Sequence, residues 1–100
     1  MDLRTKIALS LQRALLNNIS KHVRGICCDW NDNLDWFKII FYIDIEPNME
    51  ESELLSVVMT EFSCDLQHFE KFYEECIFSD KPYYEIDNLR MVVFWREENL

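Results

Sequence analysis

The chain has 100 residues, which suffices for one hydrophobic core, so we expect a single domain over residues 1–100. Hydrophobic residues make up 49% of the chain, which excludes a wholly disordered protein, and the net charge of −9 disfavours binding to nucleic acid or anionic membranes. No stretch approaches the roughly 20 apolar residues of a membrane span, and no signal peptide is recognisable, so we expect a soluble protein of the cytoplasm.

A helix is the first predicted element, over residues 3–17. Apolar residues recur at helical spacing, for example at Ile7 and Leu11, while polar residues mostly occupy the other side. Asp2 can cap the first turn, and Asn17 can end the helix because asparagine tolerates the left-handed backbone conformation.

Two strands follow, over residues 22–30 and 36–45, and the Asn- and Asp-rich turn at residues 31–33 predicts that they form a hairpin. The alternating pattern of the second strand predicts one face with Phe37, Ile39, Phe41, Ile43 and Ile45. The opposite face then carries Trp36, Lys38, Ile40, Tyr42 and Asp44.

A second helix is predicted from Asn48 to about Leu66. Asn48 can cap it, and Glu51 follows three residues later, as in a capping box. The expected buried stripe of this helix consists of Leu54, Val57, Val58 and Phe62. Residues 70–78 and 89–95 predict two further strands, although the first of these segments could instead continue a helix.

The resulting order is helix, strand, strand, helix, strand, strand. Short links between consecutive strands favour an antiparallel sheet, and two amphipathic helices can cover one of its faces. The predicted fold class is therefore α+β, with a four-stranded antiparallel sheet in one layer and two helices in the other. The second face of the sheet is expected to be partly open.

Sequence motifs for catalysis are missing. Gly25 is the only glycine, which excludes the glycine-rich loops that bind phosphates and dinucleotides, and neither a GxSxG nor an HExxH motif occurs. The 19 carboxylates offer many pairs, but no spacing singles out one of them. An enzyme is therefore the least favoured hypothesis, and no cofactor is expected.

The four cysteines include no CxxC pair; they are Cys27, Cys28, Cys64 and Cys76. Cys64 and His68 would share a helix face, but their spacing matches no zinc-site pattern. Cys27 and Cys28 would point to opposite faces of a strand. We therefore expect reduced thiols, no metal site and no reactive cysteine.

Charge is distributed unevenly along the chain. Residues 1–40 carry six Lys/Arg and four Asp/Glu, whereas residues 41–100 carry four Lys/Arg and fifteen Asp/Glu. The acids of the second part predict a surface that attracts a basic protein, although the dipole of the second helix also accounts for some of them. Aromatic residues on an open sheet face are typical of a protein interface or a homodimer contact. The expected partner-binding residues are Trp36, Tyr42, Asp44, Glu46, Glu50, Glu51, Glu74 and Glu75.

The segment Lys6–Leu16 (KIALSLQRALL), followed by Arg24 and Gly25, resembles the beginning of a group of short bacterial proteins. Phe41–Asp44 (FYID) resembles the second strand of that group, and Trp95 resembles part of its closing strand. The group consists of immunity proteins of contact-dependent growth inhibition and related polymorphic toxin systems. It carries no motif that marks catalytic residues, so none is transferred to this chain.

The resemblance implies a protein that binds and neutralises the C-terminal toxin domain of its own system. Such toxins are commonly nucleases with basic substrate-binding clefts, which an acidic inhibitor can cover. Our hypothesis from the sequence is therefore an immunity protein that inhibits a basic toxin domain by protein–protein contact. The alternative is a homo-oligomeric structural or adaptor protein that associates through the open sheet face.

Overall fold

The structure, a computed structural model, describes residues 2–97, while residue 1 and residues 98–100 lie outside the described part. Its elements follow the expected order, with one short 3-10 helix added before the last strand. They are α1 (Leu3–Leu15), β1 (Val23–Trp30), β2 (Trp36–Ile43), α2 (Met49–Asp65), β3 (Lys71–Phe78), η1 (Tyr83–Glu85) and β4 (Met91–Trp95). Residues 71–78 are thus a strand and not a continuation of the second helix. No helix within residues 2–97 is long and apolar enough to cross a membrane.

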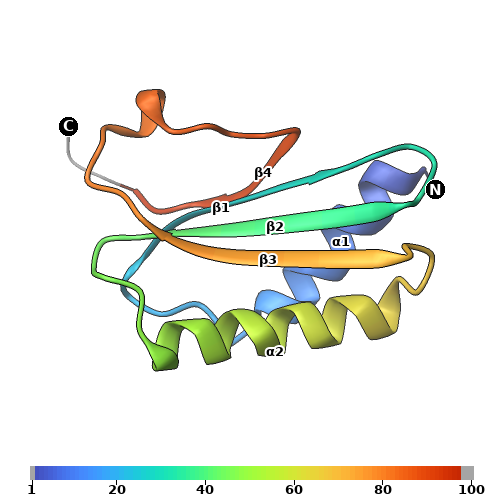
Figure 1. Ribbon diagram of the computed structural model, residues 1–100, viewed down its shortest axis with the longest axis horizontal. Coiled ribbons are helices and arrows are strands. Elements are labelled where there is room, and N and C mark those ends of the chain that lie inside the picture. The colour runs from blue at the N-terminus through green and yellow to red at the C-terminus, as the bar shows by residue number, and fades with distance from the viewer. Residues whose placement is uncertain (1, 98–100) are drawn as a thin grey trace.

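Both helices lie on the same face of the four-stranded sheet, as the sequence predicts (Figure 1). The core fills the space between these two layers. Alternate residues of β2 enter it from the sheet, and Ile7 and Leu11 of α1 enter it from the helix layer. Phe37 lies at its centre, where its ring centroid is 4.3 Å from that of Phe62 in α2 and 5.4 Å from that of Phe69. The two-layer α+β prediction is therefore confirmed.

The prediction of a purely antiparallel sheet is wrong. The strand order is β3-β2-β1-β4, in which β1 pairs antiparallel with both β2 and β4, whereas β2 pairs parallel with β3. The cause is α2, which returns the chain along the sheet before β3 begins, so β3 runs in the same direction as β2. A parallel pair requires such a long crossover, and a helix usually provides it.

Local capping follows the sequence predictions closely. Asp2 accepts a hydrogen bond from the backbone N–H of Thr5 at 2.8 Å, and Asn48 accepts one from the N–H of Glu51 at 2.9 Å. Helix α1 ends at Leu15, two residues earlier than predicted, and Asn17 has the left-handed conformation with φ of 65°.

The buried stripe of α2 differs from the predicted one. Val58 and Phe62 are buried as expected, but Leu55 and Met59 complete the stripe. Val57, predicted to be buried, instead has an exposed fraction of 43%. The helix is therefore rotated relative to the prediction, and Val57 lies on its solvent-facing side.

Glu51 is also buried, with an exposed fraction of 3%, although we expected it on the surface. Its carboxylate accepts a hydrogen bond from the Ser20 hydroxyl at 2.7 Å, and the Ser20 Oγ accepts one from the N–H of His22 at 3.1 Å. These bonds join the connection between α1 and β1 to the first turn of α2. A buried carboxylate requires such a partner, because desolvation without one is costly.

The second face of the sheet is less open than predicted. Residues 79–90, which we call the strap, connect β3 to β4 across this face (Figure 1). Ile86 of the strap forms a small second core with Cys27, Ile40 and Tyr42. Consequently Ile40 and Tyr42, expected on an open surface, are buried.

Gly25 lies directly under the indole ring of Trp95, which it pairs with across β1 and β4. A Cβ atom added at position 25 would lie 2.0 Å from Trp95 Cε3. The guanidinium carbon of Arg24 is 5.8 Å from the centroid of a Trp95 ring, a cation–π distance. Only glycine therefore allows the indole to rest against the sheet at this position.

We predict that Gly25→Ala destabilises the fold by about 1–3 kcal/mol, since overpacking forces the indole or the strand to move. Thermal denaturation followed by circular dichroism measures the effect. The double variant Gly25→Ala/Trp95→Leu removes the clashing ring and should recover part of the loss relative to Trp95→Leu alone. An unchanged melting temperature for Gly25→Ala would show that the ring does not rest on Gly25.

The Ser20–Glu51 hydrogen bond generates a second prediction. Ser20→Ala leaves the buried carboxylate without its hydroxyl donor, so the free energy of unfolding should fall by about 1–3 kcal/mol. Ser52→Ala is the control, because Ser52 is exposed one residue later in α2, and it should change stability by less than about 0.5 kcal/mol. Equal stability of the two variants in urea unfolding would contradict this role of Ser20.

Candidate protein-binding surface

The first turns of α2 and the connection before β1 enclose an acidic groove of about 510 Å³. We call it the α2 groove. It is lined by Ser20, Lys21, His22, Glu50, Glu51, Glu53, Leu54 and Val57. The acids are there because the positive end of a helix dipole favours carboxylates in the first turn. Lys21 is the one lysine or arginine among these lining residues.

A second hollow of about 550 Å³ continues along the outer side of α2. Its lining consists of Glu53, Ser56, Val57, Thr60 and Glu61, so it shares Glu53 and Val57 with the α2 groove. The Ser56 hydroxyl donates a hydrogen bond to Glu74 of β3 at 2.8 Å. The two hollows together with Glu74 therefore form one continuous acidic surface, which we call the acidic flank.

Asp44 lies just after β2, beside the α2 groove. Its two carboxylate oxygens are 3.0 Å from His22 Nδ1 and 2.9 Å from Arg96 Nη1. Desolvation opposes ionisation of Asp44, but the hydrogen bonds from Arg96 and His22 outweigh it and hold its pKa below the ordinary value. Asp44 is thus ionised at neutral pH and already engaged in pairs within the chain.

The structure separates the predicted partner-binding residues into groups. Glu46 and Glu50 are exposed near the α2 groove, whereas Glu51 and Tyr42 are buried and cannot reach a partner directly. The expectation that these two residues are accessible is wrong. The physical reason is that both side chains have partners inside the fold. Glu51 accepts a hydrogen bond from the Ser20 hydroxyl, and the Tyr42 hydroxyl donates one to the carbonyl of Asp87 at 2.9 Å.

Glu74 and Glu75 lie on opposite faces of the sheet, so they do not form one patch. Glu74 faces α2, as its bond with Ser56 shows, while Glu75 faces the other side and lies 3.7 Å from Lys38 Nζ. Trp36 is half-buried on the face of β2 that also carries Lys38.

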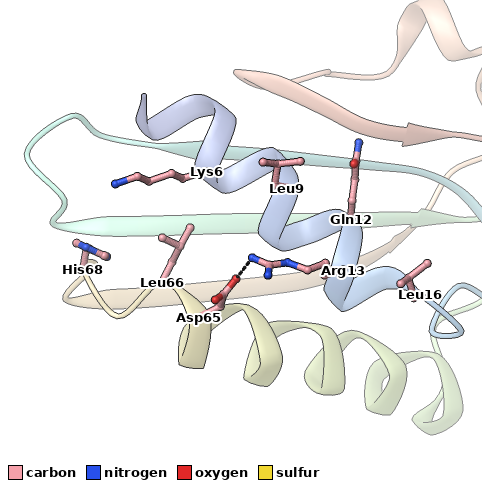
Figure 2. A pocket seen from close by; sticks show the side chains of 8 residues that line it. All are labelled: Lys6, Leu9, Gln12, Arg13, Leu16, Asp65, Leu66 and His68. Atoms are coloured by element: carbon pink, nitrogen blue, oxygen red, sulfur yellow. Dashed lines mark hydrogen bonds and ion pairs between the residues drawn. The ribbon is translucent and has the colours of Figure 1, made fainter. Parts of the chain in front are cut away.

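A different groove, of about 790 Å³, lies between α1 and the end of α2 (Figure 2). It is lined by Lys6, Leu9, Gln12, Arg13, Leu16, Asp65, Leu66 and His68. Figure 2 shows Arg13 reaching across to Asp65, where the two side chains form an ion pair at 2.8 Å. We call this the α1 groove; unlike the α2 groove, it carries two basic side chains and one carboxylate. The sequence signal for the α1 groove was the pair Leu9 and Leu16, two apolar residues that do not fit the spacing of the buried stripe of α1.

Two exposed tyrosines of the strap, Tyr83 and Tyr84, were also missed by the sequence reasoning. Their signal was a pair of aromatic residues placed among acids in a segment with no helical or strand period.

Thiol chemistry finds no support in the surroundings of the cysteines. Burial raises the pKa of Cys27 to about 11 and that of Cys28 to about 12, and burial also raises the pKa of Cys76. These thiols stay protonated at neutral pH and are poor nucleophiles. Cys64 is exposed and not in a disulfide. Within residues 2–97 no group of three or more His, Cys, Asp or Glu side chains is arranged to hold a metal ion.

Solved structures with a similar arrangement include the one described as "MamM CTD - Copper form". It is 15% identical with a TM-score of 0.50, and the alignment covers 88% of this chain and 92% of that chain. A substituted MamM CTD in a manganese form is 15% identical with a TM-score of 0.49, covering 87% of this chain and 90% of that one. At such identity the likeness concerns the fold alone. Among curated proteins, the comparison gives no match.

A family model gives the functional assignment. The model described as "MafI2 immunity protein" matches residues 4–98, which include every helix and strand of the structure except the first residue of α1. The expectation of an immunity protein is confirmed at this level. The chain belongs to the MafI2 immunity protein family.

Proposed function

We propose that this chain neutralises the toxin domain of its own system by binding it directly in the cytoplasm, with the acidic flank as the main contact. Membership of an immunity family supports a toxin as the partner. The observation that carries the choice of surface is the α2 groove, in which acids surround an apolar centre.

Charge is the first argument for the acidic flank. The two hollows along α2 are lined by the four glutamates Glu50, Glu51, Glu53 and Glu61 and by a single lysine. A basic partner is attracted to such a surface, and its association is accelerated over that of a neutral pair. A nuclease toxin fits this chemistry, because a cleft that binds nucleic-acid phosphates presents Lys and Arg side chains. These side chains can pair instead with the exposed carboxylates of Glu50, Glu53 and Glu61.

The apolar centre is the second argument. Val57 belongs to both hollows and is 43% exposed, and Leu54 beside it is half-buried. Protein interfaces commonly place apolar residues at the centre and polar residues at the rim. Carboxylates around Val57 reproduce that arrangement on the outer side of α2.

Inhibition then requires only that the immunity protein occupies the basic surface of the toxin. The bound immunity protein covers the basic surface of the toxin and excludes nucleic acid from it, with no chemical step on either chain. The test is to mix the purified protein with the toxin domain encoded beside its gene. A one-to-one complex without toxin activity supports the proposal, whereas an active toxin with no complex overturns it.

Charge reversal provides a sharper prediction. Glu50→Lys/Glu53→Lys should weaken toxin binding by at least about tenfold, mainly through slower association, and the loss should shrink at high salt. Asp35→Lys/Glu70→Lys is the control, because it makes the same charge change at the opposite end of the sheet, where β2 and β3 begin. Biolayer interferometry at two salt concentrations measures both. An equal loss of toxin affinity in the two double variants would show that binding depends on net charge alone and not on the α2 groove.

Val57 generates a separate prediction. Because its side chain is exposed, Val57→Asp should change the free energy of unfolding by less than about 1 kcal/mol, yet it should weaken the complex by tenfold or more. Leu9→Asp is the control, since Leu9 is equally exposed in α1, away from the proposed contacts. Titration calorimetry and urea unfolding separate the two effects. Unchanged toxin affinity of Val57→Asp would show that Val57 does not belong to the interface.

A further inference from the structure

The strap is anchored to the sheet at its beginning, middle and end, although it has no regular structure over most of its length. Arg24 Nη1 donates a hydrogen bond to the carbonyl of Ser79 at 2.9 Å at its beginning. In the middle, the Tyr42 hydroxyl donates to the carbonyl of Asp87, and Ile86 is buried against the sheet. At its end, the N–H of Arg90 donates to the carbonyl of Cys28 at 3.2 Å. The strap therefore presents its outward side chains in fixed positions.

Those outward side chains are aromatic. Tyr83 and Tyr84 lie in the 3-10 helix η1, which projects from the strap away from the sheet (Figure 1). Tyr84 is 71% exposed and Tyr83 is 44% exposed, and their ring centroids are 5.9 Å apart in an edge-to-face arrangement. The Tyr83 ring is in turn 6.1 Å from the ring of Trp95. The tyrosines thus extend a row of rings from the sheet surface into solvent.

The charges around this row are mainly negative. Asp80, Glu85 and Asp87 are exposed in the strap, whose two basic residues are Lys81 and Arg90. Arg90, at the end of the strap, forms an ion pair with Asp32 at 2.7 Å. A tyrosine ring attracts a guanidinium group placed over its face, and a neighbouring carboxylate can bind the same group through two hydrogen bonds. Tyrosines among acids on a fixed segment are therefore suited to an arginine-bearing protein surface.

The strap also begins beside the acidic flank. The N–H of Ser79 donates a hydrogen bond to the carbonyl of Ile43 at 3.0 Å, so the strap leaves the sheet where β2 ends. Asp44 and the first turn of α2 follow directly from that same end of β2. One partner can consequently contact the α2 groove and reach the strap around this end of the sheet.

We infer that Tyr83 and Tyr84 of the strap form a second contact with the cognate toxin, at a surface of the toxin that carries arginine side chains. This inference rests on the proposed function and adds to it a contact on the face of the sheet opposite the helices. Because the row of rings is already ordered, binding costs little side-chain entropy. Removal of a ring should mainly accelerate dissociation of the complex.

Single substitutions test the inference in the full chain, with the toxin domain encoded beside its gene as the probe. Tyr84→Ala should weaken binding by at least about tenfold, since exposed aromatic anchors dominate many interfaces. Tyr84→Phe keeps the ring and should lose less than about threefold. Tyr73→Ala is the matched control, because Tyr73 is a 49% exposed tyrosine of β3 outside the strap, and it should bind like the parent chain.

The outcomes distinguish failure of the proposed function from failure of the inference alone. If the parent chain forms no complex, the proposed function fails and the inference fails with it. If the complex forms and Tyr84→Ala binds equally well, the inference fails while the proposed function stands. If sedimentation shows that the parent chain is a dimer and that Tyr84→Ala is a monomer, the rings contact a second copy of this chain, which also overturns the inference.

Discussion

The parallel pairing of β2 with β3 determines where the surface residues of this protein lie. Trp36 to Ile43 pair with Lys71 to Phe78 without a register shift, and α2 makes the return between the two strands. Since both strands end at the same edge of the sheet, three features meet there: the first turn of α2, the paired carboxylate of Asp44 and the beginning of the strap. An antiparallel β3 would have placed the strap at the opposite end, away from the acids of α2.

Helix α2 has one side that stabilises the fold and another that is available to a partner. Its inner side is fixed near its C-terminal end by Phe62, whose ring packs against those of Phe37 and Phe72. Its first turn is fixed by the Ser20–Glu51 hydrogen bond. The outer side therefore presents its glutamates and Val57 from a rigid element, and rigid presentation reduces the entropy lost on binding. Concentrated carboxylates repel one another, which is a cost in stability that a basic partner would relieve.

The features that the sequence predicts correctly are local ones. Helix starts at Asp2 and Asn48 follow from side-chain caps, and the alternating residues of β2 follow from strand geometry. Strand direction is not local, because the same alternation suits a parallel or an antiparallel neighbour. The rotation of α2 was ambiguous because Leu54, Leu55, Val57 and Val58 are all apolar and allow two stripes.

The candidate site was predictable in part. Glu46, Glu50 and Glu74 are exposed as expected, since a carboxylate is rarely buried. Glu51 is the exception, because only the folded chain brings Ser20 to it from 31 residues away. Tyr42 is covered because the strap folds back over the sheet, and a segment without a hydrophobic period gives no sign of this. The tyrosines of the strap were missed for the same reason.

Hydrogen–deuterium exchange of the free chain and of its toxin complex tests the central claim most directly, because it locates the interface without assuming any contact residue. Binding through the acidic flank and the strap predicts slower exchange in the first turns of α2, residues 49–57, and in the strap, with no change in residues 6–16. Protection confined to α1 and to residues 65–68 would place the toxin at the α1 groove and contradict the account.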